Sequence, residues 1–591
     1  MRAGPSNASP LKSSLIAAML AMVVILLLSW PQIAAVWADG RLGDTDDAMR
    51  MAQIRDWMAG QNWYDLRQYR LAPPEGAPMH WTRVVDVQVT LLIHASGLLF
   101  EPARAEIAAR LTYMFILFGF MLWGAARLGR MLAGPAGVAP AMALIAASGL
   151  MFGYMQFGRV DHHALQMVLL LFVWEAAVRA LDERHAHVAA IAGALVALSI
   201  SVSVETAMML AGAGALAPLN WVARGEPARK ALLWLSISLC IALLICGALF
   251  IATNTSGPAA CDALSSAFVF AGLSGAGAMA LLYIASPRLV NWQARLGALV
   301  FAGAGALGVV LFTYPACAIH PYAAMDPLVR AIWFDNVPEA LSFTSMLAQD
   351  GTAAIAFVPP IMLGTFSLAF AIWKTQGLAR RRWLAMAAAF AIACATLAIE
   401  VRALTQVATI ACWGAVFVGI SLARRMRAPL LSIAPVVFMS PLFWAIMKAA
   451  TIEEPVGAPS SRACYLPDSY QKLAALHKGL VLAPINLGGH IIAHTPHSVL
   501  GGAYHRISKE NCAVLEMLLA PPDEARALLR NAGVFYVALC FDADTLATIS
   551  QRAPAGLAAT LMRDQAAIDW LAPADQKSGP VPEPLRIYKV R

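Results

Sequence analysis

Apolar runs of about twenty residues recur along most of this chain, and a run of that length can cross a lipid bilayer as a helix. Charged residues make up only 13% of the 591 positions, whereas a soluble globular chain carries about 25%. The sequence therefore predicts a polytopic α-helical membrane protein with about thirteen transmembrane helices, over residues 14–37, 108–131, 137–157, 164–181, 187–204, 206–223, 231–252, 265–286, 295–313, 353–373, 383–399, 403–422 and 429–449.

Basic residues fix the predicted orientation, because loops rich in Lys and Arg stay on the cytoplasmic side of a membrane. Arg2 and Lys12 precede the first run without an acidic residue, which predicts a cytoplasmic N-terminus. A cleaved signal peptide is the alternative for this run, but the run exceeds the roughly 7–15 apolar residues of such a segment. The net charge of +8 follows from basic clusters that all fall in predicted cytoplasmic loops, so we expect no nucleic-acid partner: Arg127 with Arg130, Arg184, Arg224 with Arg229 and Lys230, Arg288 with Arg295, Lys374 with Arg380, Arg381 and Arg382, and Arg424 and Arg425 with Arg427.

Three larger polar segments remain on the outer face in this arrangement, namely the loop 38–107, the loop 314–352 and the tail 450–591. The tail alternates strand-like runs such as GLVLAPI and GVFYVALCF with helical patterns such as PPDEARALLRNAG. We therefore expect a membrane domain over residues 1–449, followed by an extracytoplasmic α/β domain over residues 450–591.

Nine cysteines divide between the two environments. Cys261 and Cys317 lie in separate outer loops, where disulfides persist, and we predict a bridge between these two if any bridge forms. Three more cysteines belong to the tail, namely Cys464, Cys512 and Cys540. No C-x-x-C spacing occurs, which argues against a cysteine zinc site. The remaining cysteines fall inside apolar runs, where we expect small packing residues: Cys240, Cys246, Cys394 and Cys412.

Acidic residues are scarce, so a cluster of them is informative. Asp44, Asp46 and Asp47 stand within the string GDTDD, directly after the first apolar run. Carboxylates this close repel one another unless a cation or several donors neutralise them, and carboxylate oxygens suit Mg²⁺ and Mn²⁺. The pattern favours metal binding or catalysis. The alternative is a helix N-cap formed by Asp44, Thr45 or Asp46.

Three further polar features lie on the same predicted face. Asp161, His162 and His163 form the string DHH at the outer end of the third run, and ionisable residues at a membrane boundary are usually functional. Glu339 lies in the second large outer loop, and Arg402 begins the twelfth run, where a guanidinium can hold a lipid phosphate. The alternatives are a polar helix end for DHH, a solvated charge for Glu339 and a snorkelling side chain for Arg402.

Taken in order, these features resemble the catalytic subunit of oligosaccharyltransferase and the wider GT-C class of membrane glycosyltransferases. In that family thirteen helices precede a soluble C-terminal domain, an acidic motif lies in the first outer loop, and a D-x-D or D-x-H motif lies in the second. DHH at 161–163 is similar to D-x-H, and N-V-P-E at 336–339 is similar to the short motif ending in Glu in the fifth outer loop. Arg402 suits the position of the Arg that holds the lipid diphosphate.

The resemblance implies a divalent cation, Mg²⁺ or Mn²⁺, held by Asp46, Asp161, His163 and Glu339. The segment RDWMAG resembles family sequence downstream of the first acidic residue, and this register favours Asp46, with Asp44 and Asp47 as close competitors for the catalytic role. The resemblance also implies a catalytic role for Glu339 and a donor-phosphate contact for Arg402. The histidine makes Mn²⁺ the better fit, because imidazole is a softer ligand than Mg²⁺ prefers.

One family motif is missing from the tail. The family carries W-W-D-Y-G there, which recognises the Ser or Thr of an N-glycosylation sequon, and no such string occurs in this sequence. The acceptor is therefore open between asparagine, a sugar, a lipid and another group. A structural β-turn region is the alternative for the segment at the comparable place, because Gly-Gly and Asn mark turns. That segment, 483–506, offers these candidate acceptor contacts: Asn486, His490, His494, His497, His505 and Arg506.

Together these features predict a glycosyltransferase that moves a sugar or oligosaccharide from a polyprenyl-phosphate or polyprenyl-diphosphate carrier to an extracytoplasmic glycan, lipid or protein. No G-x-x-x-x-G-K-[ST] loop occurs, which agrees with a lipid-linked donor. We expect the protein among the lipids of the bacterial cytoplasmic (inner) membrane. The alternatives are a lipid or glycan transporter or flippase, which would place charges at mid-membrane, and a non-catalytic protein of envelope polysaccharide assembly.

Overall fold

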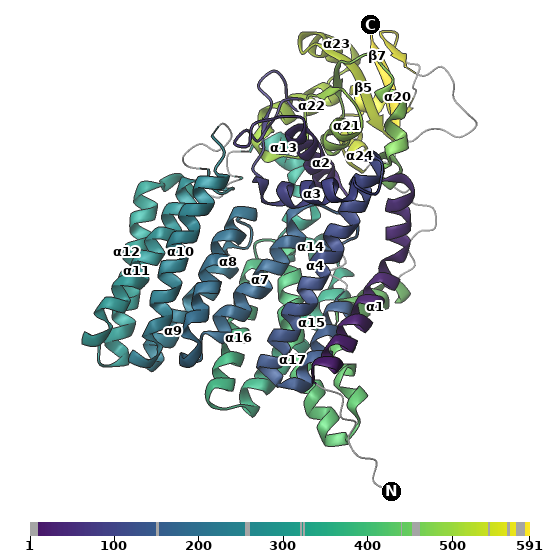
Figure 1. Ribbon diagram of the computed structural model, residues 1–591. Helices are drawn as coiled ribbons and strands as arrows, with labels where there is room; N and C mark the ends of the chain where they lie inside the picture. Colours follow the sequence, from purple (N-terminus) through teal and green to yellow (C-terminus); the bar gives the residue numbers. More distant parts are fainter. Residues whose placement is uncertain are drawn as a thin grey trace.

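Long helices that lie side by side form most of the protein, and a small α/β domain sits at one end of them (Figure 1). The computed structural model describes residues 10–148, 153–253, 260–318, 322, 325–438, 440–451, 461–541, 544–563, 568–574 and 585–591. This architecture confirms the predicted fold class, a helical membrane protein with a C-terminal sheet domain.

Each predicted apolar run coincides with helix. The run 137–157 is helical over its first part, and residues 149–152 lie outside the described residues. The last run divides between two short helices. The helices of the bundle are α1 (Pro10–Asp39), α4 (Pro102–Ala133), α5 (Val138–Ala147), α7 (His162–Arg179), α8 (Ala189–Val202), α9 (Ala207–Arg224), α10 (Arg229–Phe250), α11 (Ser266–Ala285), α12 (Trp292–Thr313), α15 (Ala353–Lys374), α16 (Gly377–Leu397), α17 (Leu404–Met426), α18 (Ala434–Phe438) and α19 (Pro441–Thr451).

Bare apolar side chains cover the outside of this bundle. Phe301 and Phe312 on α12 are 82% and 90% exposed, and no residue of that helix is buried within the described part of the protein. Such a surface suits lipid, because hydrocarbon tails are as apolar as these side chains. Seven helical segments of the described residues are long and apolar enough to cross a membrane, by length and composition alone. The number of thirteen crossings stays a prediction.

The loop 38–107 folds into two helices, α2 (Thr45–Met58) and α3 (Arg83–Ser96), with a two-residue strand pair between them, β1 (Arg67–Gln68) and β2 (Ala77–Pro78). Arg50 and Arg83 both contact Asp86, at 3.1 Å and 3.0 Å, and all three side chains are almost fully buried. Breaking a buried ion pair is strongly destabilising, because it leaves an uncompensated charge in the interior. This cluster therefore fixes α2, which carries the acidic motif, against α3.

The C-terminal domain contains a five-stranded sheet in the order β4-β3-β5-β7-β6. The first three strands are parallel, and β7 and β6 run antiparallel to their neighbours. The strands are β3 (Leu480–Leu482), β4 (Ser498–Val499), β5 (Val534–Cys540), β6 (Leu571–Pro573) and β7 (Leu585–Val590). The helices of this domain are α20 (Gln471–Ala474), α21 (Gly488–His494), α22 (Ser508–Leu519), α23 (Pro522–Asn531), α24 (Asp544–Arg552) and α25 (Leu557–Arg563).

The loop 314–352 is packed into the C-terminal domain at its first helix, α13 (Pro327–Ile332). Val329 and Ile332 are almost fully buried, in the same apolar cluster as Leu515 on α22. The loop then forms a 3-10 turn that carries Glu339 and a short helix, α14 (Phe343–Gln349), before α15 begins. The first part of this loop thus shares a core with the C-terminal domain, although the helices α15 to α19 lie between them in the chain.

Two disulfides connect the outer segments. Cys261 is bonded to Cys317, 56 positions later in the chain, as predicted. A second bridge joins Cys464 to Cys540 inside the C-terminal domain, and the sequence analysis did not assign it. Cys512 is a free thiol. The first bridge holds the chain before α11 next to the chain after α12. Residues of both segments line a cavity between the bundle and the C-terminal domain.

Candidate active site

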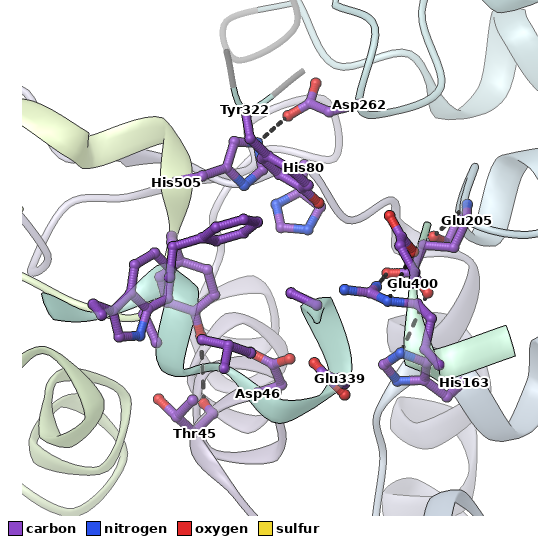
Figure 2. A pocket seen from close by; sticks show the side chains of 18 of the residues that line it. Thr45, Asp46, His80, His163, Glu205, Asp262, Tyr322, Glu339, Glu400 and His505 are labelled. Atoms are coloured by element: carbon purple, nitrogen blue, oxygen red, sulfur yellow. Dashed lines mark hydrogen bonds and ion pairs between the residues drawn. The ribbon is translucent and has the colours of Figure 1, made fainter. Parts of the chain in front are cut away.

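A cavity of about 750 Å³ lies between the helix bundle and the C-terminal domain. Residues from four distant parts of the chain line it, including Asp46, His163, Glu339 and Arg402. Figure 2 shows Asp46 and Glu339 facing the same space, with His163, Glu205 and Glu400 along one side of it. The structure therefore brings together the four polar features that the sequence analysis selected.

The three acids of GDTDD take three different positions. Asp44 is the N-cap of α2, where its side chain accepts hydrogen bonds from the backbone N–H groups of Asp46 and Asp47 at 3.0 Å. Asp47 is fully buried and accepts from the N–H groups of Val160 and Asp161, at 2.7 Å and 3.0 Å. Asp46 is the acid of this motif that lines the cavity. The expected N-cap and the expected site acid are thus both present, on different residues.

Arg159 joins the acidic motif to DHH. Its guanidinium contacts Asp44, lies 3.0 Å from Asp47 and lies 3.3 Å from Asp161. Together with the backbone contacts of Asp47, this places the two motifs side by side, although more than a hundred residues separate them in the chain. The sequence analysis did not select Arg159, because one basic residue next to DHH gave no reason to expect three carboxylate partners.

DHH itself forms a compact cluster at the start of α7. Asp161 is the N-cap of that helix; its carboxylate lies 2.6 Å from Nδ1 of His162 and also contacts Nδ1 of His163. One ligand atom from each of the three residues lies within 4.8 Å of the others, a grouping that could hold a metal ion. The acidic and histidine side chains of this cluster therefore offer a candidate cation site.

Glu205 is a site residue that the sequence analysis missed. It lies between α8 and α9 and lines the cavity, where it contacts the guanidinium of Arg402 and lies 3.3 Å from Nε2 of His163. Glu400 lies 3.1 Å from Nε of the same arginine. The sequence contained one signal for Glu205, which is the acid in the short hairpin SVSVETAMM. An ionisable residue at a membrane boundary is costly, so it usually has a function.

Charge crowding changes the protonation of these groups. Burial raises the pKa of Asp46 well above its usual range, and the nearby carboxylates of Asp44, Asp161 and Glu339 raise it further. Burial also raises the pKa of Asp47 to about 7, although Arg159 opposes the shift. Burial acts in the same direction on Asp161, but the two histidines outweigh it and hold the pKa of that carboxyl well below its usual range. A cation near Asp46 and Glu339 would relieve the repulsion between these acids.

The residues fit a divalent cation by their chemistry. Carboxylate oxygens and imidazole nitrogens are ligands for Mg²⁺, Mn²⁺ and Zn²⁺. Nδ1 of His162 lies 2.6 Å from Asp161 and Nε2 of His163 lies 3.3 Å from Glu205, so both ring nitrogens face carboxylates that could share a cation with them. His162 was not among the predicted ligands, and Asp46 and Glu339 approach the cluster from the cavity side.

Replacing Glu205 by Ala is expected to lower the activity of the protein by at least about a hundredfold. The change leaves Arg402 and His163 without a carboxylate that both contact, so both cationic groups lose the charge that holds them in place. Catalytic rate and thermal stability should be measured together on the purified protein. Glu75→Ala is a suitable control, since that acid is exposed and does not line the cavity. Full activity in Glu205→Ala would contradict this role.

The predicted acceptor contacts of the tail divide into two groups. Asn486 and His505 line the cavity, and Arg506 lies behind His505, where its guanidinium pairs with Asp262 at 2.6 Å. The other three histidines do not line the cavity. His490 and His497 are fully buried, and His494 stacks against Tyr470. Their predicted acceptor role stays untested. In the structure Nε2 of His497 lies 2.7 Å from the carbonyl oxygen of Leu473, and the ring of His490 packs against Tyr465.

Because His490 is buried, we expect low pH to lower the stability of the folded state. Burial lowers the pKa of His490 to about 4, whereas the unfolded value is about 6.5. The unfolded chain therefore binds the extra proton between these values, so stability is lost as the pH falls below about 6.5, by about 2 kcal/mol at pH 5. Thermal unfolding of the full-length protein at pH 7 and pH 5 measures this loss.

A ring without a titratable nitrogen should reduce that loss. We expect His490→Phe to show a smaller fall in the unfolding temperature between pH 7 and pH 5, because Phe can retain the stacking against Tyr465 and Tyr470. His477→Ala is the control, since that side chain is exposed. Equal pH dependence in His490→Phe and the wild-type protein would refute the assignment.

Neither a protein-family model nor a curated protein sequence matches this chain. Solved structures do match it. The archaeal oligosaccharyltransferase AglB from Archaeoglobus fulgidus, in complex with an inhibitory peptide and a dolichol-phosphate, matches with a TM-score of 0.66 and 13% identity, over 92% of this chain and 71% of that chain. The Archaeoglobus fulgidus oligosaccharyltransferase in complex with Zn and sulfate matches with a TM-score of 0.61 and 14% identity, over 95% of this chain and 71% of that chain.

A third structure of that archaeal protein is tethered with an acceptor peptide containing the NVT sequon, and it matches with a TM-score of 0.62 and 13% identity over 93% of this chain and 72% of that chain. At such low identity, the likeness concerns the fold. It confirms the resemblance that the sequence motifs predicted: this chain has the GT-C membrane fold of the archaeal oligosaccharyltransferase.

Proposed function

We propose that this protein is a membrane glycosyltransferase that moves a sugar or oligosaccharide from a polyprenyl-phosphate or polyprenyl-diphosphate carrier to an acceptor outside the cytoplasmic membrane. One observation carries the proposal: Asp46, His163, Glu339 and Arg402 line a single cavity at the junction of the helix bundle and the C-terminal domain. The dolichol-phosphate bound to the archaeal protein of the same fold supports a polyprenyl donor.

The donor phosphate would bind on the side of Arg402. A guanidinium suits phosphate because it donates two parallel hydrogen bonds, and Glu205 and Glu400 on either side orient it. The pKa of His163 is raised well above its usual range, because Asp161 and Glu205 outweigh its burial. Without a bound cation, His163 therefore adds a second positive charge beside Arg402.

A divalent cation would be held by Asp46, Asp161, His163 and Glu339, with His162 beside them. When bound, such an ion neutralises the charge that develops on the leaving phosphate. Asp46 and Glu339 face the cavity and would orient the acceptor group or take its proton. The zinc in the archaeal structure supports a metal at this fold, and the imidazole favours Mn²⁺ over Mg²⁺ as the physiological ion.

The same proposal places residues 450–591 and the cavity outside the cytoplasm, with residues 1–449 as the membrane domain. The two disulfides support this orientation, because such bonds persist in oxidising compartments and are rare in the cytosol. A reporter enzyme fused after Arg591 should behave as an exported protein. Cytoplasmic reporter activity would reverse the orientation.

Purified protein in lipid nanodiscs, supplied with lipid-linked saccharides extracted from the membranes of its own host, tests the activity. Sugar should leave the lipid and appear on an acceptor in the host's envelope extract, excess chelator should stop the reaction, and Mn²⁺ should restore it. Transfer that continues in chelator would remove the cation from the proposal. In sealed vesicles, movement of the lipid-linked saccharide across the bilayer without transfer would show a flippase instead.

A further inference from the structure

A continuous row of aromatic rings forms one wall of the cavity. Successive ring centroids lie 4.8 Å apart for Phe334 and Tyr322, 4.9 Å for Tyr322 and His505, 5.5 Å for His505 and His80, and 5.2 Å for His80 and Trp81. Every one of these rings lines the cavity. We call this row the aromatic belt, and define it by five residues: His80, Trp81, Tyr322, Phe334 and His505.

Three separate segments build the belt. His80 and Trp81 come from the loop before α3, Tyr322 and Phe334 from the loop around α13, and His505 from the C-terminal domain. Figure 2 shows His80, Tyr322 and His505 together on one side of the cavity, across the space from Glu205 and Glu400. At its other end the belt adjoins the candidate cation site, because the ring centroid of Trp81 lies 6.0 Å from that of His162.

The charges behind the belt compensate one another. Asp262 also lines the cavity on this side, and its carboxylate lies 2.6 Å from Nε2 of His505 and 2.6 Å from the guanidinium of Arg506. Asp262 directly follows Cys261, which the disulfide to Cys317 holds in place. The belt is thus a fixed, nearly neutral surface with apolar ring faces and polar ring edges.

We infer that the aromatic belt is the acceptor subsite and that it binds a sugar ring, so that the acceptor is a glycan. This inference rests on the proposed function and names its acceptor class. A pyranose presents a face of C–H groups and a rim of hydroxyls, which match an aromatic face and the polar edges of tyrosine and histidine. A charged acceptor would find no uncompensated partner charge on Asp262 or Arg506.

A peptide acceptor fits this wall less well. None of the described residues that line the cavity belongs to a β-strand, so an extended peptide finds no strand edge to pair with. Asn486, the amide-bearing residue of the C-terminal wall, already accepts from Nε1 of Trp333 at 3.1 Å and donates to Thr545 at 3.2 Å. An acyl chain would offer no partner to the polar edge of His80, which is costly in an enclosed site.

The transfer that this subsite would serve is balanced. A hydroxyl oxygen of the acceptor sugar forms the new bond to the anomeric carbon of the donor, and the bond from that carbon to the carrier phosphate breaks. The bonding electrons leave with the phosphate oxygen, and the hydroxyl proton passes to a carboxylate of the cavity or to solvent. No oxidant, reductant or further co-reactant is needed.

Phe334 gives the sharpest test, because its side chain has no polar atom. Phe334→Leu retains the apolar volume and removes the aromatic face, whereas Phe334→Tyr retains the face. Saturation-transfer NMR on the full-length protein in nanodiscs would measure the binding of three probes: the methyl glycosides of glucose, galactose and mannose. A synthetic peptide containing Asn-x-Thr is the competing acceptor, and Phe301→Leu on the lipid-facing side of α12 is the matched control.

We expect at least one glycoside to bind the wild-type protein. Phe334→Leu should weaken that binding by about three- to tenfold, and Phe334→Tyr by less than about twofold, because one aromatic contact contributes about 0.5–1.5 kcal/mol beyond area burial, which is about two- to thirteenfold in affinity. Phe301→Leu should bind as the wild type. Binding of the peptide alone, no glycoside binding, or an unchanged affinity in Phe334→Leu would overturn the inference.

Undecaprenyl phosphate, measured on the same samples, separates this inference from the proposed function. It should bind the wild type and Phe334→Leu equally, and Arg402→Ala should weaken it, because the guanidinium, and not the belt, would hold the phosphate. Failure of undecaprenyl phosphate to bind the wild type would count against the proposed function. Normal binding of undecaprenyl phosphate together with an unaltered glycoside affinity in Phe334→Leu would count against the belt alone.

Discussion

Asp46→Ala is expected to lower sugar transfer by at least about a thousandfold, with the protein still folded and inserted in the membrane. Asp46 is the acid of its motif that lines the cavity, and Asp44, Asp161 and Glu339 crowd it. Loss of this carboxylate would remove both a cation ligand and the group that orients the acceptor, and contributions of that kind reach about 10²–10⁴ in rate. Single-turnover transfer with saturating lipid-linked donor measures the effect.

The neighbouring acids provide the contrast for this experiment. Asp47→Ala should instead reduce thermal stability, because Asp47 is fully buried and accepts from the N–H groups of Val160 and Asp161. Glu75→Ala should change neither property, since Glu75 is exposed in the same loop. Wild-type transfer in Asp46→Ala would remove the cavity-facing acid from the mechanism.

Asp161→Asn is expected to abolish transfer and to weaken Mn²⁺ binding by at least about tenfold. Asn is as good an N-cap as Asp, so the start of α7 should be retained. The lost negative charge leaves Arg159, His162 and His163 without their shared carboxylate. Removal of a metal ligand or of its supporting partner costs about 10–100-fold in metal affinity or activity.

Two measurements on the same sample distinguish a site defect from misfolding. Electron paramagnetic resonance reports free Mn²⁺, and thermal unfolding reports the fold. Asp182→Asn is the matched control, because Asp182 is also a buried helix cap whose side chain accepts from the N–H of Arg184, in a different hairpin of the bundle. Unchanged Mn²⁺ affinity in Asp161→Asn would exclude Asp161 as a ligand.

Some site residues could be predicted because they belong to short, unusual sequence motifs. Three carboxylates in GDTDD and the DHH string are unusual in a chain with few charges, and each follows or precedes an apolar run that fixes its side of the membrane. Asp44 also behaves as its spacing indicates, since it caps α2 as an N-cap residue should. The Cys261–Cys317 bridge follows from the same predicted topology, in which both cysteines belong to outer loops.

Other site residues belong to no recognisable sequence motif. Glu205 is one acid in a short hairpin, and its importance comes from Arg402, in the turn before α17, and from His163 on α7. The aromatic belt is likewise invisible in the sequence, because its rings come from three segments that are far apart in the chain. Conversely, the polar sequence around His490 and His497 suggested that both could contact an acceptor, but both side chains are fully buried in the fold.

The sequence by itself determined the membrane-spanning helices, the order of the acidic, DHH and Glu339 motifs and the α/β character of the tail. These properties depend on the length and periodicity of apolar runs and on residues close together in the chain, so local rules are sufficient. Only the tertiary structure decided that Asp46 rather than Asp44 or Asp47 lines the cavity, and that α13 packs into the C-terminal domain. Those outcomes depend on contacts between segments hundreds of residues apart, which packing and charge pairing select together.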